Sequence, residues 1–424
     1  MMLMANQFFL TGYQKQAGSG WSTQFPITPV KTTPFPDVSK YILPQMGSDD
    51  AGNAVAAWVD MDTTSSSSLD YISHVYVRNY NKVTGWSAPI LMQSNPAEYA
   101  TAVNLTVLND GTAWVVWTER TIKAPMYSVL HKGALFAAKY SPLSGWGSPE
   151  KVTDDYLMNF IGIVEVVEMG ARIAADRSGN PVVVWVRDLG AAEFVLYSTN
   201  KTAGVWGAPV IVAPAQPNVG GIVHSITDFD IAMDGDGNAI AVWTRLDPTG
   251  FINTVYSNRF TVEAGWGGVT IMPSVTTQHS FSPKLAMDGL GNAFLLWVEY
   301  DGSAANAIWA ARFDRVLGWQ PPVIISSPSE AFEDSSDPQL EFDAFGNAVA
   351  VWSKYDALLN RTIIRACRYD RNTGWGVNKT ISNGNGIARK PQLAVSGSGR
   401  ATAIWYQYDF GIEPWRIWSN DFTP

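Results

Sequence analysis

A tryptophan repeat runs through the whole chain and constrains its fold more than any other feature. Seven tryptophans each end a short apolar run, and they stand 53 to 68 residues apart. A second series of seven follows a glycine, directly in six repeats and after one intervening residue in the seventh. A period of this length is typical of chains built from repeated supersecondary units. The first series is Trp58, Trp117, Trp185, Trp243, Trp297, Trp352 and Trp405, and the second is Trp21, Trp86, Trp146, Trp206, Trp266, Trp319 and Trp375.

Each repeat has the pattern of four short strands, which the fifth repeat shows best. An apolar stretch ends in Asp288-Gly-Leu-Gly-Asn292, a glycine-bearing turn that suits a hairpin with one residue at positive φ. Residues 293–300 are rich in large apolar side chains and too tightly bounded by turn residues to form a helix. A third strand is expected over 307–313, and a fourth after Gly318-Trp319. No segment has a sustained 3.6-residue period, so an all-β fold is predicted.

Seven such units predict a seven-bladed β-propeller of four-stranded antiparallel blades, because stacked blades leave only short, protected sheet edges. We expect residues 1–424 to form a single domain. The last repeat, 391–424, stops before its Gly-Trp strand, and N-terminal strands at about 6–27 would supply it. Residues 8–13 resemble a surplus third strand, and the sequence leaves open whether they add to that blade or displace its C-terminal strand.

The repeat motifs resemble those of bacterial seven-bladed propellers with tryptophan-rich repeats. The D-x-x-G-N turn, found at Asp49, Asp176, Asp234, Asp288 and Asp343, is similar to that of NHL-type repeats. The Gly-Trp strands look like those of some propeller lectins. These are scaffold motifs, so the resemblance implies a fold and a bacterial source but leaves the function open. Sialidase-type Asp-boxes are not matched, because each tryptophan lies nine residues after the aspartate.

Composition excludes several classes of partner and cofactor. The net charge is −9 and the 29 basic residues are scattered, which argues against a nucleic-acid partner. There is no apolar run of 18 residues, and the first residues lack the basic and apolar regions of a signal peptide. A single cysteine excludes a disulfide framework. We expect no cofactor and no metal, since the only calcium-like loop, at Asp234, lacks the required Glu.

The first candidate site consists of tyrosine–aspartate pairs that follow the apolar-run tryptophan by three and four residues. A ring face beside a carboxylate suits sugar recognition, because C–H groups stack on the ring while hydroxyls donate to the oxygens. The same pairs also arise as turn entries, and the sequence does not separate the two readings. The pairs are Tyr300-Asp301, Tyr355-Asp356 and Tyr408-Asp409.

The second candidate site is a set of polar residues, one just before each first strand. First strands line the central tunnel of a propeller, so these side chains could bind a small polar or ionic ligand at its mouth. The alternative is a solvated funnel that requires polar residues in any case. The mixed charges of Arg172, Asp230 and Lys284 make that arc the most interesting. The seven residues are Gln45, Asn104, Arg172, Asp230, Lys284, Gln339 and Gln392.

The third candidate site is formed by the histidines, which all fall on or near the variable loops of one face. Histidine is the usual proton-transfer group, but none of the four has local metal-ligand spacing, and scattered loop histidines are commonly just solvated. They are His74, His131, His224 and His279.

From these features we predict a non-enzymatic, lectin-like recognition module, extracellular or on the cell surface. It would bind glycans or a glycosylated surface protein through the variable loop face, since binding residues usually lie on loops of a rigid scaffold. One alternative is a protein-interaction scaffold or adhesion module that uses the apolar insert at 152–170. A second alternative is a lyase or glycosidase in which His224 or His279 acts with a loop carboxylate. The sequence leaves the oligomeric state open.

Overall fold

The structure is a computed structural model of the whole chain. The chain divides into two compact units, Val38–Ala215 and Met1–Asp37 with Gln216–Pro424. We call them the three-blade unit and the four-blade unit. The described residues are 20–23, 25–26, 45–62, 72–94, 99–122, 130–153, 156–159, 170–189, 194–216, 223–247, 251–272, 278–300, 305–326, 334–409 and 412–424.

The described residues form seven antiparallel blades and no helix, so the predicted seven-bladed, all-β propeller class is confirmed. Each blade has three main strands and a fourth that is broken into two short pieces, both paired with the third strand. The first piece is the Gly-Trp dipeptide, or Val-Trp in blade 3. No helix in the described part of the chain is long and apolar enough to cross a membrane.

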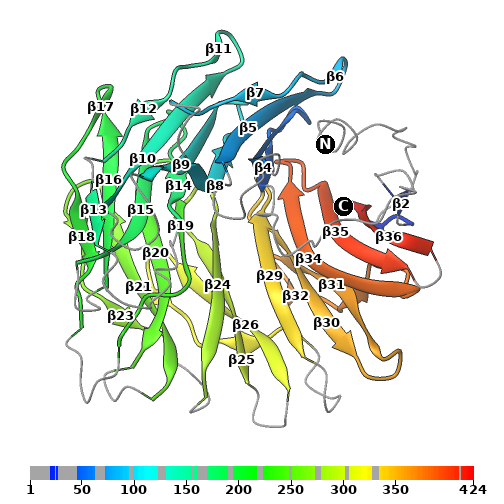
Figure 1. Cartoon of the computed structure of the whole chain (residues 1–424). Helices are drawn as coiled ribbons and strands as arrows, with labels where there is room; N and C mark the ends of the chain where they lie inside the picture. The colour runs from blue at the N-terminus through cyan, green and yellow to red at the C-terminus, as the bar shows by residue number, and fades with distance from the viewer. Residues whose placement is uncertain are drawn as a thin grey trace. The chain divides into compact units, whose positions relative to one another are not determined.

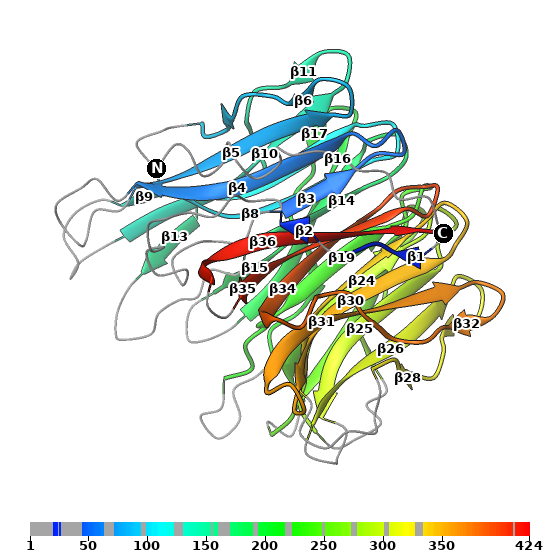
Figure 2. The same cartoon turned by 90° about the vertical axis from the view of Figure 1, so that its right-hand side faces the viewer.

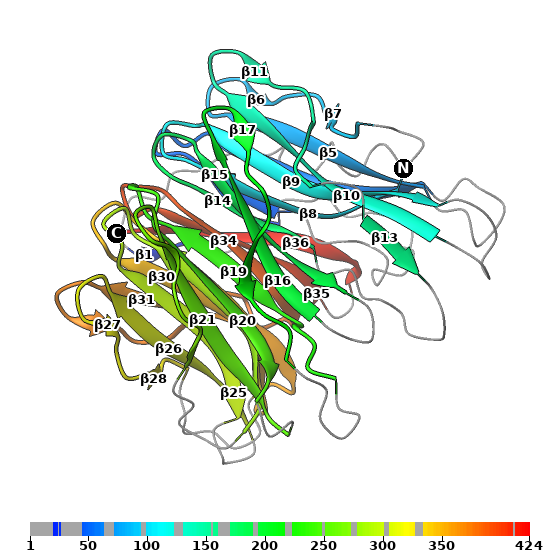
Figure 3. The same ribbon diagram turned by 90° about the vertical axis from the view of Figure 1, so that its left-hand side faces the viewer.

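The three-blade unit contains blades 1 to 3, and Figure 3 shows the strands of blade 3 side by side. In blade 2 an additional short strand, β13, also pairs with the third strand. Blade 1 comprises β3 (Gln45–Ser48), β4 (Ala54–Asp62), β5 (Ile72–Asn81), β6 (Gly85–Trp86) and β7 (Ile90–Leu91); blade 2 comprises β8 (Tyr99–Val107), β9 (Ala113–Ile122), β10 (Leu130–Ser141), β11 (Gly145–Trp146), β12 (Glu150–Lys151) and β13 (Tyr156–Asn159); blade 3 comprises β14 (Arg172–Ala175), β15 (Pro181–Asp188), β16 (Phe194–Thr202), β17 (Val205–Trp206) and β18 (Val210–Ala213).

The four-blade unit contains blades 4 to 7, coloured green to red in Figure 1 apart from the N-terminal strands of blade 7, which are blue. Blade 4 comprises β19 (Phe229–Met233), β20 (Ala239–Leu246), β21 (Asn253–Thr261), β22 (Gly265–Trp266) and β23 (Thr270–Ile271); blade 5 comprises β24 (Ser280–Met287), β25 (Ala293–Tyr300), β26 (Asn306–Asp314), β27 (Gly318–Trp319) and β28 (Val323–Ile324); blade 6 comprises β29 (Ser335–Phe342), β30 (Ala348–Asp356), β31 (Arg361–Asp370), β32 (Gly374–Trp375) and β33 (Lys379–Thr380); blade 7 comprises β34 (Gly386–Val395), β35 (Ala401–Asp409), β36 (Ile412–Thr423), β1 (Gly20–Trp21) and β2 (Phe25–Pro26).

Both ends of the chain build blade 7, as the sequence predicted. The N-terminal β1 lies beside β36, with Trp21 opposite Phe422, and β2 pairs with the same strand (Figure 2). The surplus strand expected at 8–13 lies outside the described residues.

The tryptophans in the middle of the second strands pack into the cores of the blades. Trp117, Trp243, Trp297, Trp352 and Trp405 are at most 1% exposed. Their neighbours come from the adjacent blade as well as from their own: Trp297 lies in one cluster with Val242 and Val255 of blade 4. Burial of aromatic and aliphatic surface between neighbouring sheets therefore stabilises the packing of the blades.

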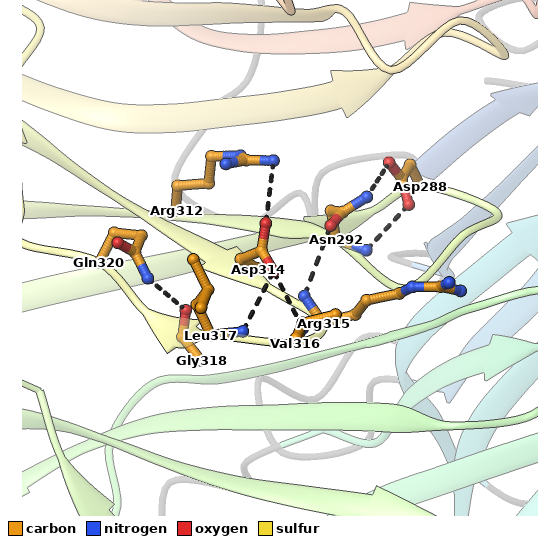
Figure 4. A network of polar contacts seen from close by, with 9 residues as sticks. All are labelled: Asp288, Asn292, Arg312, Asp314, Arg315, Val316, Leu317, Gly318 and Gln320. Carbon is orange, nitrogen blue, oxygen red and sulfur yellow. Dashed lines mark hydrogen bonds and ion pairs between the residues drawn. The ribbon is translucent and has the colours of Figure 1, made fainter.

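The D-x-x-G-N motif closes the hairpin between first and second strands through its own side chains. In blade 5, the two carboxylate oxygens of Asp288 accept hydrogen bonds from the backbone and side-chain nitrogens of Asn292, both at 2.9 Å (Figure 4). The Asn292 Oδ1 atom then accepts a hydrogen bond from the Arg315 backbone N–H at 3.4 Å. Gly291 has φ 88°, a conformation that favours glycine. The motif thus ties this turn to the hairpin between β26 and the Gly-Trp strand.

Candidate functional site

The seven polar residues predicted to precede the first strands occupy one register position. Each stands opposite the residue that directly precedes the second-strand tryptophan, as Lys284 stands opposite Leu296 and Gln392 opposite Ile404. They lie within the first strands rather than before them, although Gln45 and Arg172 are the first residues of theirs. The position is therefore a repeated element of the fold.

Some of these side chains bond to the backbone of the next blade. Asn104 Oδ1 accepts a hydrogen bond from the Ile173 backbone N–H, and Asp230 Oδ2 accepts one from the Leu285 backbone N–H, both at 3.1 Å. A first strand is a sheet edge with unpaired backbone groups, so an acceptor from the neighbouring blade satisfies a donor that the ladder leaves open. Asn104 and Asp230 therefore have a structural role at this position, because their side chains hydrogen-bond to the next blade.

Within the four-blade unit, the first strands β19, β24, β29 and β34 lie in sequence against one another. This arrangement brings Asp230 and Lys284 together, with 4.0 Å between Lys284 Nζ and Asp230 Oδ2. Arg172, the third member of the predicted arc, belongs to the three-blade unit and donates to the carbonyl oxygen of Ala171 at 3.3 Å.

Glu341 on β29 belongs to the same cluster, and the sequence analysis missed it. Although water reaches its side chain, the surrounding protein displaces much of the bulk solvent, and this desolvation raises the pKa of Glu341 to about 7. The negative charge of Asp230 acts in the same direction, while Lys284 opposes it. Glu341 lies two residues after Gln339, so strand alternation could have found it. We call Asp230, Lys284 and Glu341 the first-strand cluster.

A strained bulge lies next to this position in four blades. Ala102, Ser282, Asp337 and Lys390 have φ between 50° and 56°, and each lies two residues before the polar residue of its blade. The ladder register shifts at the same point in all four first strands. Three of the strained residues precede a proline, which restricts them further. Strain of this kind persists only where surrounding structure holds it, and it is concentrated at functional sites.

The tyrosine–aspartate pairs are separated by the fold into different settings. Tyr355 and Asp356 enter the hairpin between β30 and β31, where Tyr355 Oη donates to Asn360 Oδ1 at 2.6 Å and Asp356 Oδ1 accepts from the Leu359 N–H at 2.9 Å. Asp409 is 8% exposed and accepts a hydrogen bond from Gln407 Nε2 at 2.5 Å.

The remaining residues of these pairs lie on separate strands or outside the described residues. Tyr408 is half-buried on β35, and Tyr300 is half-buried at the end of β25, while Asp301 lies outside the described residues. The described pairs are thus engaged locally and do not form one common cluster.

The histidines also occupy separate environments. His224 is 2% exposed; its Nδ1 lies 3.4 Å from the Leu246 carbonyl oxygen, to which Tyr256 Oη also donates, at 3.5 Å. His279 Nδ1 accepts a hydrogen bond from the Asn253 backbone N–H at 3.2 Å, and its ring stacks on Phe281. His131 lies on β10, and its side chain is outside the described structure.

A second polar group surrounds His224 at the end of blade 4, but it is buried. Arg245 is 3% exposed and desolvation lowers its pKa to about 10, while burial raises the pKa of Tyr256. No substrate reaches these side chains in this conformation, whereas Lys284 and Glu341 are accessible. The described residues contain no group of three or more His, Cys, Asp or Glu that could hold a metal ion.

Comparison with known proteins supports the fold. The chain resembles a protein of unknown function from Dyadobacter fermentans at 10% identity, covering 90% of this chain and 94% of that one, with a TM-score of 0.50. A PL25 ulvan lyase gives 10% identity, 88% and 90% coverage and a TM-score of 0.49. The NanB sialidase from Streptococcus pneumoniae gives 9% identity, 94% and 71% coverage and a TM-score of 0.46. No protein-family model and no curated protein matches the chain.

Proposed function

We propose that the protein is a carbohydrate-active propeller that cleaves glycosidic bonds at the first-strand cluster. The observation that carries the proposal is that three consecutive first strands bring Asp230, Lys284 and Glu341 together, with Lys284 Nζ 4.0 Å from Asp230 Oδ2 and with Glu341 coupled to both charges. Ionisable groups whose surroundings shift their pKa values in an accessible cluster are typical of catalytic sites.

Two carboxyl groups in unlike environments are the minimum that glycoside hydrolysis requires. Glu341, with its pKa near 7, keeps its proton in about half of the molecules at neutral pH, and this protonated form would donate it to the glycosidic oxygen as the C–O bond breaks. Asp230, the partner of Lys284, would face the developing positive charge on the sugar or accept a proton from the attacking water. That water supplies the hydroxyl group of the new reducing end.

The surrounding side chains suit a hydroxyl-rich ligand. Gln339 and Gln392 stand at the same register position as Lys284 and supply amide donors and acceptors from the next two blades. Asp230 is fixed in place because its Oδ2 accepts the Leu285 N–H and its Oδ1 accepts the Ile231 N–H, each at 3.1 Å. A rigid carboxylate beside a titrating one provides the preorganised charge that catalysis needs. A glycan partner and an extracellular location belong to the same proposal.

The test is hydrolysis of polysaccharides by the full chain and by Glu341→Gln. Polygalacturonate, alginate, chondroitin sulfate, xylan and galactan serve as substrates, and reducing ends are measured. We expect release from at least one of them, and a fall in kcat of about 100-fold or more in Glu341→Gln with binding retained, because the proton donor is lost. Asp314→Asn, which removes a half-buried carboxylate at the β26–β27 turn, away from the first strands, serves as the matched control with full activity.

The pH profile separates proton donation from a structural role of Glu341. Activity should fall as pH rises through about 7, and Lys284→Met should move this limb to higher pH, because Lys284 lowers the pKa of Glu341. Hydrolysis of none of the substrates, equal rates in Glu341→Gln, or products carrying the ultraviolet absorbance of unsaturated uronate would each overturn the proposal. In the first case, glycan binding by the intact protein would favour the non-enzymatic recognition module instead.

A further inference from the structure

The bulged starts of three neighbouring first strands each carry exposed side chains that do not belong to the first-strand cluster. In blades 5, 6 and 7 the strained residues are Ser282, Asp337 and Lys390, on strands that lie in sequence against one another. A bulge places two residues opposite one and redirects the side chains beside it. In blade 7, the bulge lies between Arg389 and Gln392, and both Arg389 and Lys390 are exposed.

The bulges of blades 6 and 7 are joined by a side-chain bridge. Ser353 Oγ accepts a hydrogen bond from the Lys390 backbone N–H at 3.1 Å and donates one to Asp337 Oδ2 at 3.3 Å. This bridge holds Lys390 at φ 53°, a left-handed conformation that residues other than glycine rarely adopt. The side-chain ammonium of Lys390 and the guanidinium of Arg389 form no ion pair with a described carboxylate. The strained backbone of Lys390 is thus held in a segment whose two cationic side chains, Arg389 and Lys390, are exposed to solvent.

An exposed aromatic ring stands on the corresponding part of blade 5. Phe281 directly precedes the strained Ser282, is 39% exposed and stacks on His279 with 5.8 Å between ring centroids. Exposed aromatic faces bind sugar rings through C–H contacts, whereas exposed guanidinium and ammonium groups bind carboxylates and sulfates.

We infer that the bulged segments of blades 5 to 7 bind an anionic glycan, with Phe281 stacking on a sugar ring and Arg389 and Lys390 holding a uronate carboxylate or a sulfate. This inference rests on the proposed function, since it places the polymer along the strands that carry Glu341. It also names the substrate class: an acidic polysaccharide rather than a neutral one. The mixed charge of the surface, with Asp337 beside two cations, favours spaced anionic groups over a continuous polyanion.

The test is affinity electrophoresis of the Glu341→Gln protein, so that binding is read without cleavage. Gels contain polygalacturonate, alginate, chondroitin sulfate, xylan or galactan, at low and high salt. We expect retardation in at least one anionic gel, and high salt should weaken it. Adding Arg389→Gln and Lys390→Gln to the Glu341→Gln protein should lower the affinity about tenfold. Phe281→Ala should also weaken binding, with less dependence on salt.

The matched control is Arg315→Gln/Arg371→Gln, which removes the same charge at the opposite ends of the first strands, where both arginines donate to turn carbonyls. It should retain full affinity. Retardation in neutral gels only, no retardation in any gel, or equal losses in the two double variants would overturn the inference. If anionic glycans bind as expected but the wild-type protein releases no product, the inference stands without its catalytic premise. If product forms and the cation variants bind normally, only the inference fails.

Discussion

The turn that follows β29 in blade 6 and the strand itself carry carboxylates in opposite situations. In the turn, Asp343 is 6% exposed and accepts three hydrogen bonds, from the Phe345 N–H and from both nitrogens of Asn347. On the strand Glu341, two residues earlier, is exposed and lies near the like charge of Asp230. Glycine takes the positive φ at the turn, whereas Ser282 and Asp337 take it at the bulge. The turn residues thus match the conformational and hydrogen-bonding preferences of their residue types. The non-glycine residues of the bulges do not, as is typical of functional sites.

Removing the turn carboxylate should have the largest effect on stability. Asp343→Ala leaves the buried nitrogens of Asn347 without an acceptor, so the free energy of unfolding should fall by about 3 kcal/mol. Urea unfolding followed by tryptophan fluorescence measures this change. Loss of the comparison carboxylate, in Glu341→Ala, should lower the free energy of unfolding by less than about 1 kcal/mol. Equal losses at the two positions would remove the distinction between the turn carboxylate and the strand carboxylate.

The pH dependence of stability should give the next largest difference between the two carboxylates. The folded pKa of Glu341, about 7, lies above the ordinary value of 4.5, so the folded state holds its proton over a range where the unfolded state has released it. The free energy of unfolding should therefore decline as pH rises from about 4.5 to 7. Because water reaches the side chain, screening should keep the decline below that of a fully buried carboxyl. Glu341→Gln should flatten this part of the curve, and an unchanged slope would contradict the assignment.

Backbone substitutions should give the smallest effects and opposite signs. Gly346, at φ 79° in a turn, should lose about 1 kcal/mol of stability when changed to alanine, because the side chain disfavours that conformation. Ser282→Gly should be neutral or stabilising by about 0.5 kcal/mol, since released strain outweighs the added freedom of the unfolded chain. Thermal unfolding of the two variants measures both. A destabilised Ser282→Gly would show that the bulge is unstrained.

The turn chemistry is visible in the sequence because it is local. The aspartate, glycine and asparagine of each D-x-x-G-N motif satisfy one another within five residues, so their spacing predicts the hairpin. The shorter Gly204-Val205-Trp206 variant also follows local rules: Ala203 and Gly204 both take positive φ, and Val205 replaces the usual glycine in the strand. A two-residue hairpin loop of this kind requires both conformations.

The candidate site was only partly predictable, because it depends on contacts between repeats. Asp230 and Lys284 were found from their repeated position, but Glu341 occurs at one repeat only and gave no periodic signal. The S-P-K, D-P-Q and K-P-Q tripeptides at 282–284, 337–339 and 390–392 were visible in the sequence, yet nothing local requires a positive φ before proline.

By itself, the sequence determined the seven-bladed, four-stranded plan, the hairpin turns and the role of the tryptophans in packing, since each rests on short-range patterns of apolar and turn residues. The tertiary structure alone decided which ionisable groups meet, that Asp409 and His224 are buried, and that non-glycine residues hold the strained bulges. The physical reason is distance along the chain. Lys284 and Asp230 are 54 positions apart, and their proximity comes from the packing of neighbouring first strands.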